Sequence, residues 1–327
     1  MTIRRREFIV LSGGAVVWSS TAGRGQQAAT PVIGFLNSAS PGPYAHLVQN
    51  FHQGLKETGF VEGRNVVIEY RWAEGHHDRL PELAADLIRR QVSVIFANGP
   101  AVLPAKAATK TIPIVFATAV DPVAMRLVGS LNRPGGNLTG VTTLNVEVGP
   151  KQLELLHELV PTATIISALV NPTGPGAEKQ TRDLPTAACD LGLQLHLLRA
   201  SAERDFGAAF ANLVQLRAGA LVIGIDAFFS SRSAQLASLT VRHAVPAIYS
   251  LREFAVAGGL MSYGGSFTDA YRIVGLYAGC ILRGENVADL PVHQSTKLDL
   301  IININTARAL DLTVPPSLLA RAHEVIE

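Results

Sequence analysis

Polar and aromatic residues follow the apolar runs of this sequence at regular intervals, and their types are those that bind small molecules. Asp121 and Asp226 carry carboxylates that could pair with a ligand ammonium group, and asparagine and hydroxyl side chains could hydrogen-bond a ligand. Aromatic side chains could sandwich an apolar ligand group. The candidate ligand-binding residues are Asn37, Ser38, Asn98, Gly99, Pro100, Asp121, Pro122, Thr143, Asn171, Asp226, Phe228, Tyr249 and Tyr263.

Each kind of candidate also has a purely structural alternative. Asp121 and Asp226 could cap the helix that follows each of them. Asn37, Asn98 and Asn171 could be loop residues that tolerate left-handed backbone, and aromatic residues that end strands often belong to the core. The sequence leaves these alternatives open and makes Asp121 the first candidate for an ammonium partner.

Patterns typical of catalysis do not assemble into a site. His76 and His77 lie in a polar loop without a nearby cysteine or a spaced carboxylate pair, which favours a solvated pair over a metal site. The Gly-rich stretch at 134–137 precedes an apolar run, where a turn explains it better than a phosphate-binding loop. The sequence has no Gly-x-Ser-x-Gly or Walker motif, and no Gly-x-Gly-x-x-Gly follows its first apolar run. We therefore expect no catalysis, no cofactor and no metal.

The elements that would position the candidates are strands and helices in strict alternation, which indicates βαβ units and parallel sheets. Ligands bind beyond the carboxyl ends of strands in such sheets, which is where the candidates fall. The first half predicts strands at 32–36, 66–70, 92–97, 112–117 and 138–142, with helices at 44–57, 81–90 and 101–109 and a short one after Pro122. The second half predicts strands at 165–170, 193–198, 220–225 and 247–250, with helices at 151–159, 178–191, 206–216 and 231–243.

The pattern changes after Gly259, where a strand at 260–263, a helix at 267–282 and a strand at 300–304 precede two helical pieces. These elements are too many for one edge of the second unit. We expect the chain to return to the first unit near Gly264 and to cross back near 296–299. The predicted fold is α/β, with two doubly wound parallel-sheet lobes joined by a multi-crossing hinge, as in type I periplasmic binding proteins. Lobe 1 would comprise 31–145 plus 264–297, and lobe 2 would comprise 146–263 plus 298–327.

The first 25 residues are typical of an export signal. A basic cluster at 4–6 precedes a short apolar stretch at 8–18 and a region of small residues that ends at Gly25. Arg5 and Arg6 resemble the twin-arginine pair, and the apolar stretch is too short to span a bilayer. We expect a soluble periplasmic protein cleaved near Gly25, with a basic cytosolic start as the alternative.

Composition fits such a protein. With 327 residues, of which 48% are hydrophobic and 17% charged, the chain can bury two ordinary cores. Without the signal, its 28 basic and 26 acidic residues become 24 and 25, which leaves no basic excess to hold nucleic acid. Cys189 and Cys280 both lie in helical patterns, where two buried free thiols are favoured over a disulfide.

Several stretches across nearly the whole mature chain resemble a known family, the ABC transporter substrate-binding proteins of the type associated with aromatic and branched-chain amino acid uptake. They are FVEG at 60–63, IEYRWA at 68–73, DRLPELA at 78–84, IPIVF at 112–116, DPV at 121–123, RPGGNLTG at 133–140, REF at 252–254 and GGLMSYG at 258–264. The chain departs from the family's usual loops at 98–100 and 119–120, so the resemblance leaves the solute open.

The resemblance implies a two-lobed receptor without catalysis, which captures a small molecule and delivers it to an ABC permease with its ATPase. The solute would be an amino acid or a related carboxylate held in the interlobe cleft, and the receptor would be monomeric. One alternative is a periplasmic sensor domain for a signalling partner, which shares the binding step. Another is a two-domain enzyme such as a glycosyltransferase, which would need a nucleotide-binding loop that the sequence lacks.

Overall fold

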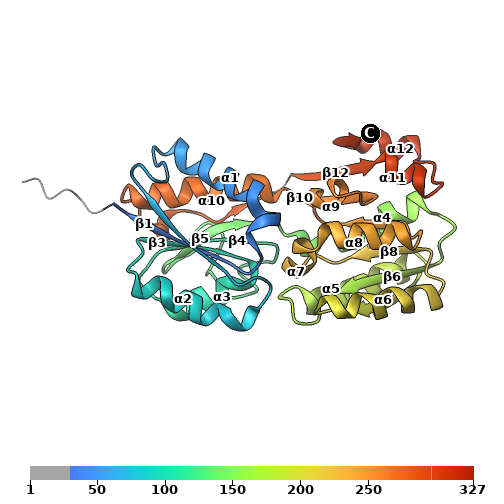
Figure 1. Ribbon diagram of the computed structural model, residues 1–327, viewed down its shortest axis with the longest axis horizontal. Helices are drawn as coiled ribbons and strands as arrows, with labels where there is room; N and C mark the ends of the chain where they lie inside the picture. The colour runs from blue at the N-terminus through green and yellow to red at the C-terminus, as the bar shows by residue number, and fades with distance from the viewer. Residues whose placement is uncertain (1–29, 296) are drawn as a thin grey trace, which may run out of the picture. The chain divides into compact units, whose positions relative to one another are not determined.

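The computed structural model describes residues 30–295 and 297–327, which form two parallel-dominated sheets covered by helices (Figure 1). The predicted export signal lies outside the described residues. The predicted α/β class is confirmed. Within the described part of the chain, no helix is long and apolar enough to cross a membrane.

The first sheet has six strands, all paired in parallel, in the order β11-β5-β4-β3-β1-β2. Its strands are β1 (Val32–Asn37), β2 (Val67–Trp72), β3 (Val94–Asn98), β4 (Ile114–Thr118), β5 (Leu138–Thr142) and β11 (His293–Gln294). One face packs against α1 (Pro41–Glu57) and α10 (Phe267–Leu282), and the other packs against α2 (Leu80–Arg89) and α3 (Val102–Ala108) (Figure 1). The central strands β3 and β4 are buried along their whole length, as expected for strands covered on both faces.

The second sheet has seven strands in the order β13-β12-β10-β9-β8-β6-β7, and only the β10–β12 pair is antiparallel within the described residues. Its strands are β6 (Ile165–Val170), β7 (Gln194–Arg199), β8 (Ala220–Ile223), β9 (Ala247–Tyr249), β10 (Met261–Gly265), β12 (Leu298–Asn303) and β13 (Glu324–Ile326). One core contains α4 (Gly149–Leu159), α5 (Ala177–Asp190), α11 (Ile304–Ala309) and α12 (Pro316–Arg321). The other contains α6 (Glu203–Gln215), α7 (Ala227–Ser231), α8 (Ser233–Arg242) and α9 (Arg252–Val256).

The chain passes between the sheets at several places. It leaves β5 for α4 and β6, and after β10 it runs into α10, which packs on α1 of the first sheet. It then adds β11 beside β5 before β12 pairs with β10 in the second sheet. These passages give the elements that a multi-crossing hinge needs, while the predicted lobe boundaries stay predictions.

Two glycines let α1 and α10 approach closely. A Cβ on Gly275 would lie 2.1 Å from the Phe51 carbonyl oxygen, and a Cβ on Gly54 would lie 1.8 Å from the Arg272 carbonyl oxygen. Both distances are far inside van der Waals contact, so only glycine permits this crossing. The crossing fixes α1, whose first turn borders the pocket described below.

The helix predicted at 231–243 is present as α8 (Ser233–Arg242), and the short α7 before it was not predicted. Two local expectations were wrong. The residues after Pro122 form turns rather than a short helix, and Arg126 there takes a left-handed φ of 54°. Both cysteines are free, but only Cys280 is buried, since Cys189 lies on the exposed side of α5.

Candidate functional site

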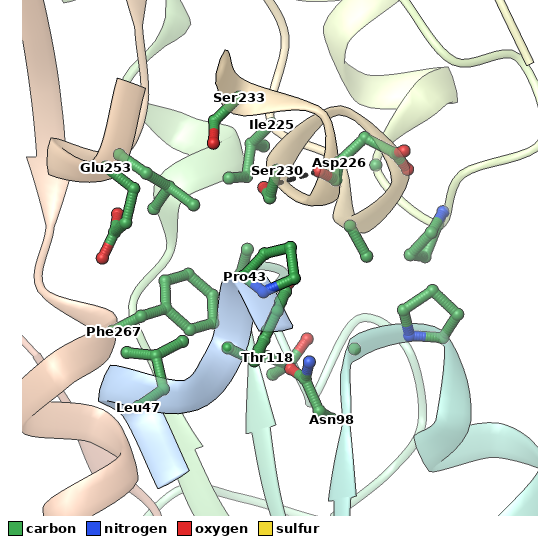
Figure 2. A pocket seen from close by; sticks show the side chains of 18 of the residues that line it. Pro43, Leu47, Asn98, Thr118, Ile225, Asp226, Ser230, Ser233, Glu253 and Phe267 are labelled. Carbon is green, nitrogen blue, oxygen red and sulfur yellow. Dashed lines mark hydrogen bonds between the residues drawn. The ribbon is translucent and has the colours of Figure 1, made fainter. Parts of the chain in front are cut away.

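A pocket of about 850 Å³, counting the part open to solvent, lies where loops from the carboxyl ends of strands in both sheets meet (Figure 2). The first sheet contributes the start of α1 and the loops after β3 and β4, and the second contributes the loops after β6, β8 and β9. Its lining residues are Pro43, Tyr44, His46, Leu47, Asn98, Gly99, Pro100, Thr118, Ala119, Val120, Pro175, Gly176, Ile225, Asp226, Ala227, Ser230, Ser233, Leu251, Glu253 and Phe267.

Most of the wall is apolar. Figure 2 shows Pro43 projecting between Thr118 and Asn98 on one side and Ile225 and Ser230 on the other. Leu47 and Phe267 close a neighbouring side of the pocket in the same view. Such a wall would remove the apolar part of a solute from water, which contributes about 25 cal/mol for each Å² buried.

Tyr44 brings a hydroxyl group to the pocket from the first turn of α1. Its ring packs against Trp72 and Tyr271, with ring centroids 6.4 Å apart in each pair, and only 6% of the residue is exposed. Burial raises the pKa of the hydroxyl well above its ordinary value, and the carboxylates of Glu253 and Asp226 raise it further. Tyr44 therefore remains a neutral hydrogen-bonding group at any physiological pH.

Asp226 is the most deeply buried carboxylate that lines the pocket, with 7% of the residue exposed. Its Oδ1 caps α7 by accepting from the N–H of Phe228 at 2.8 Å and of Phe229 at 3.4 Å. The amide of Asn171 also donates to Oδ1, at 3.0 Å. Oδ2 is buried and has no hydrogen-bond partner among the described residues. Desolvation by burial outweighs these donors and raises the pKa of the Asp226 carboxyl.

The other carboxylate of the lining belongs to Glu253 on α9. Its Oε1 lies 2.8 Å from Nε2 of His46 on α1. The two side chains are 42% exposed for His46 and 26% exposed for Glu253, so solvent screens the pair. The contact joins a helix of the first sheet to a helix of the second at the edge of the pocket.

Four of the sequence-predicted residues line the pocket, namely Asn98, Gly99, Pro100 and Asp226. Asn37 lies directly beneath it, where its amide donates to the Tyr271 hydroxyl at 3.1 Å and its Oδ1 accepts from the Asn98 amide at 3.3 Å. The residue after it in the chain, Ser38, is fully buried.

Two further predicted residues support the site from behind the lining. Asn171 holds Asp226, and the Thr143 N–H donates to the carbonyl of Thr118, a lining residue, at 3.0 Å. Both are buried polar groups with partners, as positioning residues require. Their contribution would be to hold other side chains rather than to touch a solute.

The remaining predicted residues do not line the pocket. Asp121 accepts from the N–H groups of Val123 and Ala124 at 2.8 and 3.2 Å, which is the structural alternative foreseen for it, although the capped segment is a turn. Pro122 is buried within that turn.

The three aromatic candidates are also placed outside the lining. Phe228 stacks on Phe206 in the second sheet's core. Tyr249 is fully buried, with its hydroxyl 2.7 Å from Oγ1 of Thr240. Tyr263 packs against the other core of that sheet. All three therefore belong to the cores of the second sheet or pack against them, as the structural alternative for aromatic residues predicted.

The lining also contains residues that strand-end reasoning missed. Some lie at a strand end or in loops, namely Thr118, Ala119, Val120, Pro175, Gly176, Ile225 and Leu251. The others come from helices, namely Pro43, Tyr44, His46 and Leu47 on α1, Ala227 and Ser230 on α7, Ser233 on α8, Glu253 on α9 and Phe267 on α10. One signal was present, because Glu253 lies in the REF stretch at 252–254 that carries the family resemblance. Nothing in the sequence placed the first turn of α1 at the same pocket.

Within the described ranges, no group of three or more His, Cys, Asp or Glu side chains could hold a metal ion. The expected solvated character of His76 fits its exposed position, whereas His77 is half-buried. The site thus offers an apolar wall, hydroxyl groups and two carboxylates, which suit reversible binding of a small molecule.

The two sheets and their crossings define a solute-binding protein with the fold of type I periplasmic binding proteins. Residues 38–326 match the family model described as ABC transporter substrate binding protein, and the chain belongs to this family. It is a binding protein and not an enzyme.

Individual relatives support the same class. A "Tyrosine-binding protein" of Clostridioides difficile (strain R20291) is 27% identical over 266 residues, which are 81% of this chain and 76% of the relative. A solved structure of an ABC domain in complex with L-Trp from Streptococcus pneumonia is 25% identical with a TM-score of 0.80, covering 90% of this chain and all of the other. A conserved domain protein from Vibrio cholerae is 26% identical with a TM-score of 0.83, over 90% of this chain and 99% of the other.

Proposed function

We propose that this protein is the periplasmic receptor of an ABC importer, which binds a small amine-bearing solute of the amino acid type in the pocket between the two sheets. The observation that carries the proposal is the composition of the pocket, to which both sheets contribute lining loops. A solute held there contacts both sheets at once, so it favours the arrangement in which they are closed together. Closure would create the surface that a permease recognises.

The kind of solute follows from the lining and from the relatives. Apolar residues make up most of the wall, and Asp226 and Glu253 bring carboxylates to the lining. Two relatives are named for tyrosine or hold L-Trp, which both combine an apolar ring with an ammonium group. Aromatic amino acids and compounds derived from them are therefore the first solutes to test.

Location and partner complete the proposal. The basic cluster and short apolar stretch in residues 1–25 would direct export to the periplasm. The family supplies the expectation of an ABC transporter, and the partner would be its permease with the associated ATPase. We propose that the receptor acts as a monomer.

Calorimetric titration with tyrosine, tryptophan, phenylalanine, leucine and amine and acid derivatives of these compounds tests the binding step. We expect at least one to bind with 1:1 stoichiometry, and at about 100 times its Kd to raise the free energy of unfolding by about 2.7 kcal/mol. Ser233→Trp would fill the pocket from the first residue of α8 and abolish binding. Gln235→Trp is the matched control, because Gln235 is exposed on the same helix and does not line the pocket.

Two results would contradict the proposal. One is that no compound binds and native mass spectrometry of protein from its own periplasm finds no carried-over small molecule. The other is that Ser233→Trp binds as well as the wild type, which would place the solute elsewhere. Uptake assays in a strain without the protein would separate import from sensing, because only a transport receptor lowers solute uptake when it is lost.

A further inference from the structure

The first passage of the chain between the sheets, from β5 to α4, contains a residue in an uncommon backbone conformation. Leu144 has φ 49° and ψ 28°, in the left-handed region that is unfavourable for a residue with a Cβ. Between β10 and α10, where the chain passes back, Ser266 has a φ of −76°, which is ordinary backbone. Within the described residues 143–148 and 264–266, Leu144 alone has a positive φ. Backbone strain is therefore concentrated at one residue of these passages.

The position of Leu144 differs from that of most other left-handed residues in the described ranges. Gln91, Arg217, Ala244 and Asp311 each lie two residues beyond the last residue of a helix. Left-handed residues are common there, because they let the final carbonyl groups of the helix accept hydrogen bonds. Leu144 follows strand β5 instead, so the end of a helix does not explain its conformation.

Hydrogen bonds anchor the two neighbours of Leu144 to different sheets. Before it, the N–H of Thr143 donates to the carbonyl of Thr118, the last residue of β4 in the first sheet, at 3.0 Å. After it, the Asn145 side chain accepts from the N–H of Gly265 at 2.6 Å and donates to the Gly265 carbonyl at 3.2 Å. Gly265 ends β10 of the second sheet, and Asn145 is buried. Leu144 is thus the single residue between an anchor on each sheet.

A further hydrogen bond depends on the bend at Leu144. The N–H of Val146 donates to the carbonyl of Ala119 at 3.1 Å. Ala119 lies in the loop after β4 of the first sheet, and both it and Thr118 line the pocket. The chain must turn back at Leu144 for Val146 to reach this loop while Asn145 stays bonded to the second sheet. The left-handed bend therefore accompanies the contact between this passage and the wall of the pocket.

We infer that Leu144 is the residue at which the backbone bends when the two sheets open and close, and that its left-handed strain sets how much of the solute-free protein is closed. Opening would relax Leu144 and break the bond from Val146 to Ala119, so the strain favours the open state. A solute that contacts both sheets restores the bend. Its apparent affinity is the affinity of the closed state, reduced by the fraction of the free protein that is closed.

Two variants of Leu144 separate the backbone conformation from the side chain. Leu144→Gly and Leu144→Ala both remove the half-buried leucine side chain, but only the alanine variant keeps the Cβ that disfavours the left-handed region. Small-angle scattering on the solute-free full chain should give a smaller radius of gyration for the glycine variant than for the alanine variant, because the glycine variant is closed more often. This measurement does not depend on the identity of the solute.

Calorimetric titration with L-tyrosine and L-tryptophan measures the consequence for binding, and this measurement rests on the proposed function. Whichever of the two binds should bind roughly fivefold or more tightly to Leu144→Gly than to Leu144→Ala, because the closed state no longer carries the cost of the Cβ. Both variants at this position lack the same contacts of the leucine side chain, so lost packing cannot produce the difference.

Arg217 supplies the matched control. It has a left-handed φ of 52°, is exposed, and follows α6 at a distance in the chain from both passages. Arg217→Gly should have a higher melting temperature than Arg217→Ala, because the same backbone cost is relieved. The two Arg217 variants should nevertheless share one affinity and one radius of gyration, since this residue does not lie between the sheets.

The outcomes distinguish the inference from the proposed function. If no solute binds the wild type, the proposed function fails, and the scattering of the Leu144 pair alone then decides the inference. Equal radii and equal affinities in the Leu144 pair would overturn the inference and leave the proposed function intact. Differences of the same size in the Arg217 pair would also overturn it, because they would show a general effect of glycine rather than a bend at Leu144.

Discussion

His46 on α1 and Glu253 on α9 form a contact of 2.8 Å between their Nε2 and Oε1 atoms, and this contact links the helices of the two sheets beside the pocket. His46 follows Tyr44 in the first turns of the helix that lines the pocket, and Glu253 lines it from the other sheet. The pair therefore reports directly on whether the two sheets are closed together.

The first prediction concerns this pair. His46→Gln, Glu253→Gln and the double variant should give a coupling of about 0.2–1 kcal/mol in the free energy of unfolding, as expected for a half-exposed pair. The coupling should shrink in high salt, because dissolved ions screen a pair that is open to solvent. Urea unfolding at low and at high ionic strength measures it. A coupling near zero at low ionic strength would mean that the contact does not persist in solution.

The second prediction concerns the pH dependence of stability through Asp226. Burial raises the pKa of this carboxyl above its ordinary value of 3.8, so the folded protein holds the proton more tightly than the unfolded chain. Its contribution to stability is fully present below the unfolded value and is lost as the pH rises through the raised folded value. Asp226→Asn removes this loss, so the melting temperature of the variant relative to the wild type should rise from about pH 4 to about pH 7. Solute-free thermal melts check it, and a relative fall over that range would contradict it.

The third prediction isolates the Tyr44 hydroxyl. Tyr44→Phe keeps the ring that packs against Trp72 and Tyr271 and removes only the group that reaches the pocket. Affinity for a bound solute should fall by roughly fivefold, as expected for one neutral hydrogen bond, while the melting temperature should change little. His52→Phe is a useful control, since His52 lies on the same helix and contacts the Tyr70 hydroxyl without lining the pocket. Unchanged affinity in Tyr44→Phe would show that the hydroxyl does not contact the solute.

The sequence predicted the fold more fully than the site, for a physical reason. Strands such as β3 and β4 are continuous apolar runs because helices bury both of their faces. Such runs can be recognised in a single sequence, so these strands could be predicted. The short α7 was not predicted, because its five residues carry too little periodicity to indicate a helix.

Asp121 and Asp226 show where sequence reasoning about the site ended. Each follows a strand and precedes a turn or helix, and each accepts hydrogen bonds from the next N–H groups. Tertiary contacts separate the two residues, because Asn171 packs against Asp226 and buries it beside the pocket, whereas Asp121 is only half-buried and lies outside the lining. The sequence also could not predict that α1 lines the pocket. The position of α1 depends on its close contact with α10, which lies more than 200 residues further along the chain.

The fourth prediction tests this positioning. Gly275→Ala places a Cβ 2.1 Å from the Phe51 carbonyl oxygen, so α1 and α10 must separate. The variant should lose roughly 1–3 kcal/mol of unfolding free energy, in line with overpacked cores, and it should also weaken solute binding, because Pro43, Tyr44 and Leu47 move with α1. Chemical unfolding and calorimetric titration measure the two effects.

The control for this prediction is another helical glycine. Gly207 on α6 is exposed, and a Cβ added there would meet nothing within 4 Å. Gly207→Ala should therefore stabilise the protein by about 0.5–1 kcal/mol through helix propensity and leave affinity unchanged. The comparison thus separates the general effect of replacing a helical glycine from the specific effect of the α1–α10 crossing. If Gly275→Ala were as stable as the wild type, the close approach of these helices would not be required to hold the pocket together.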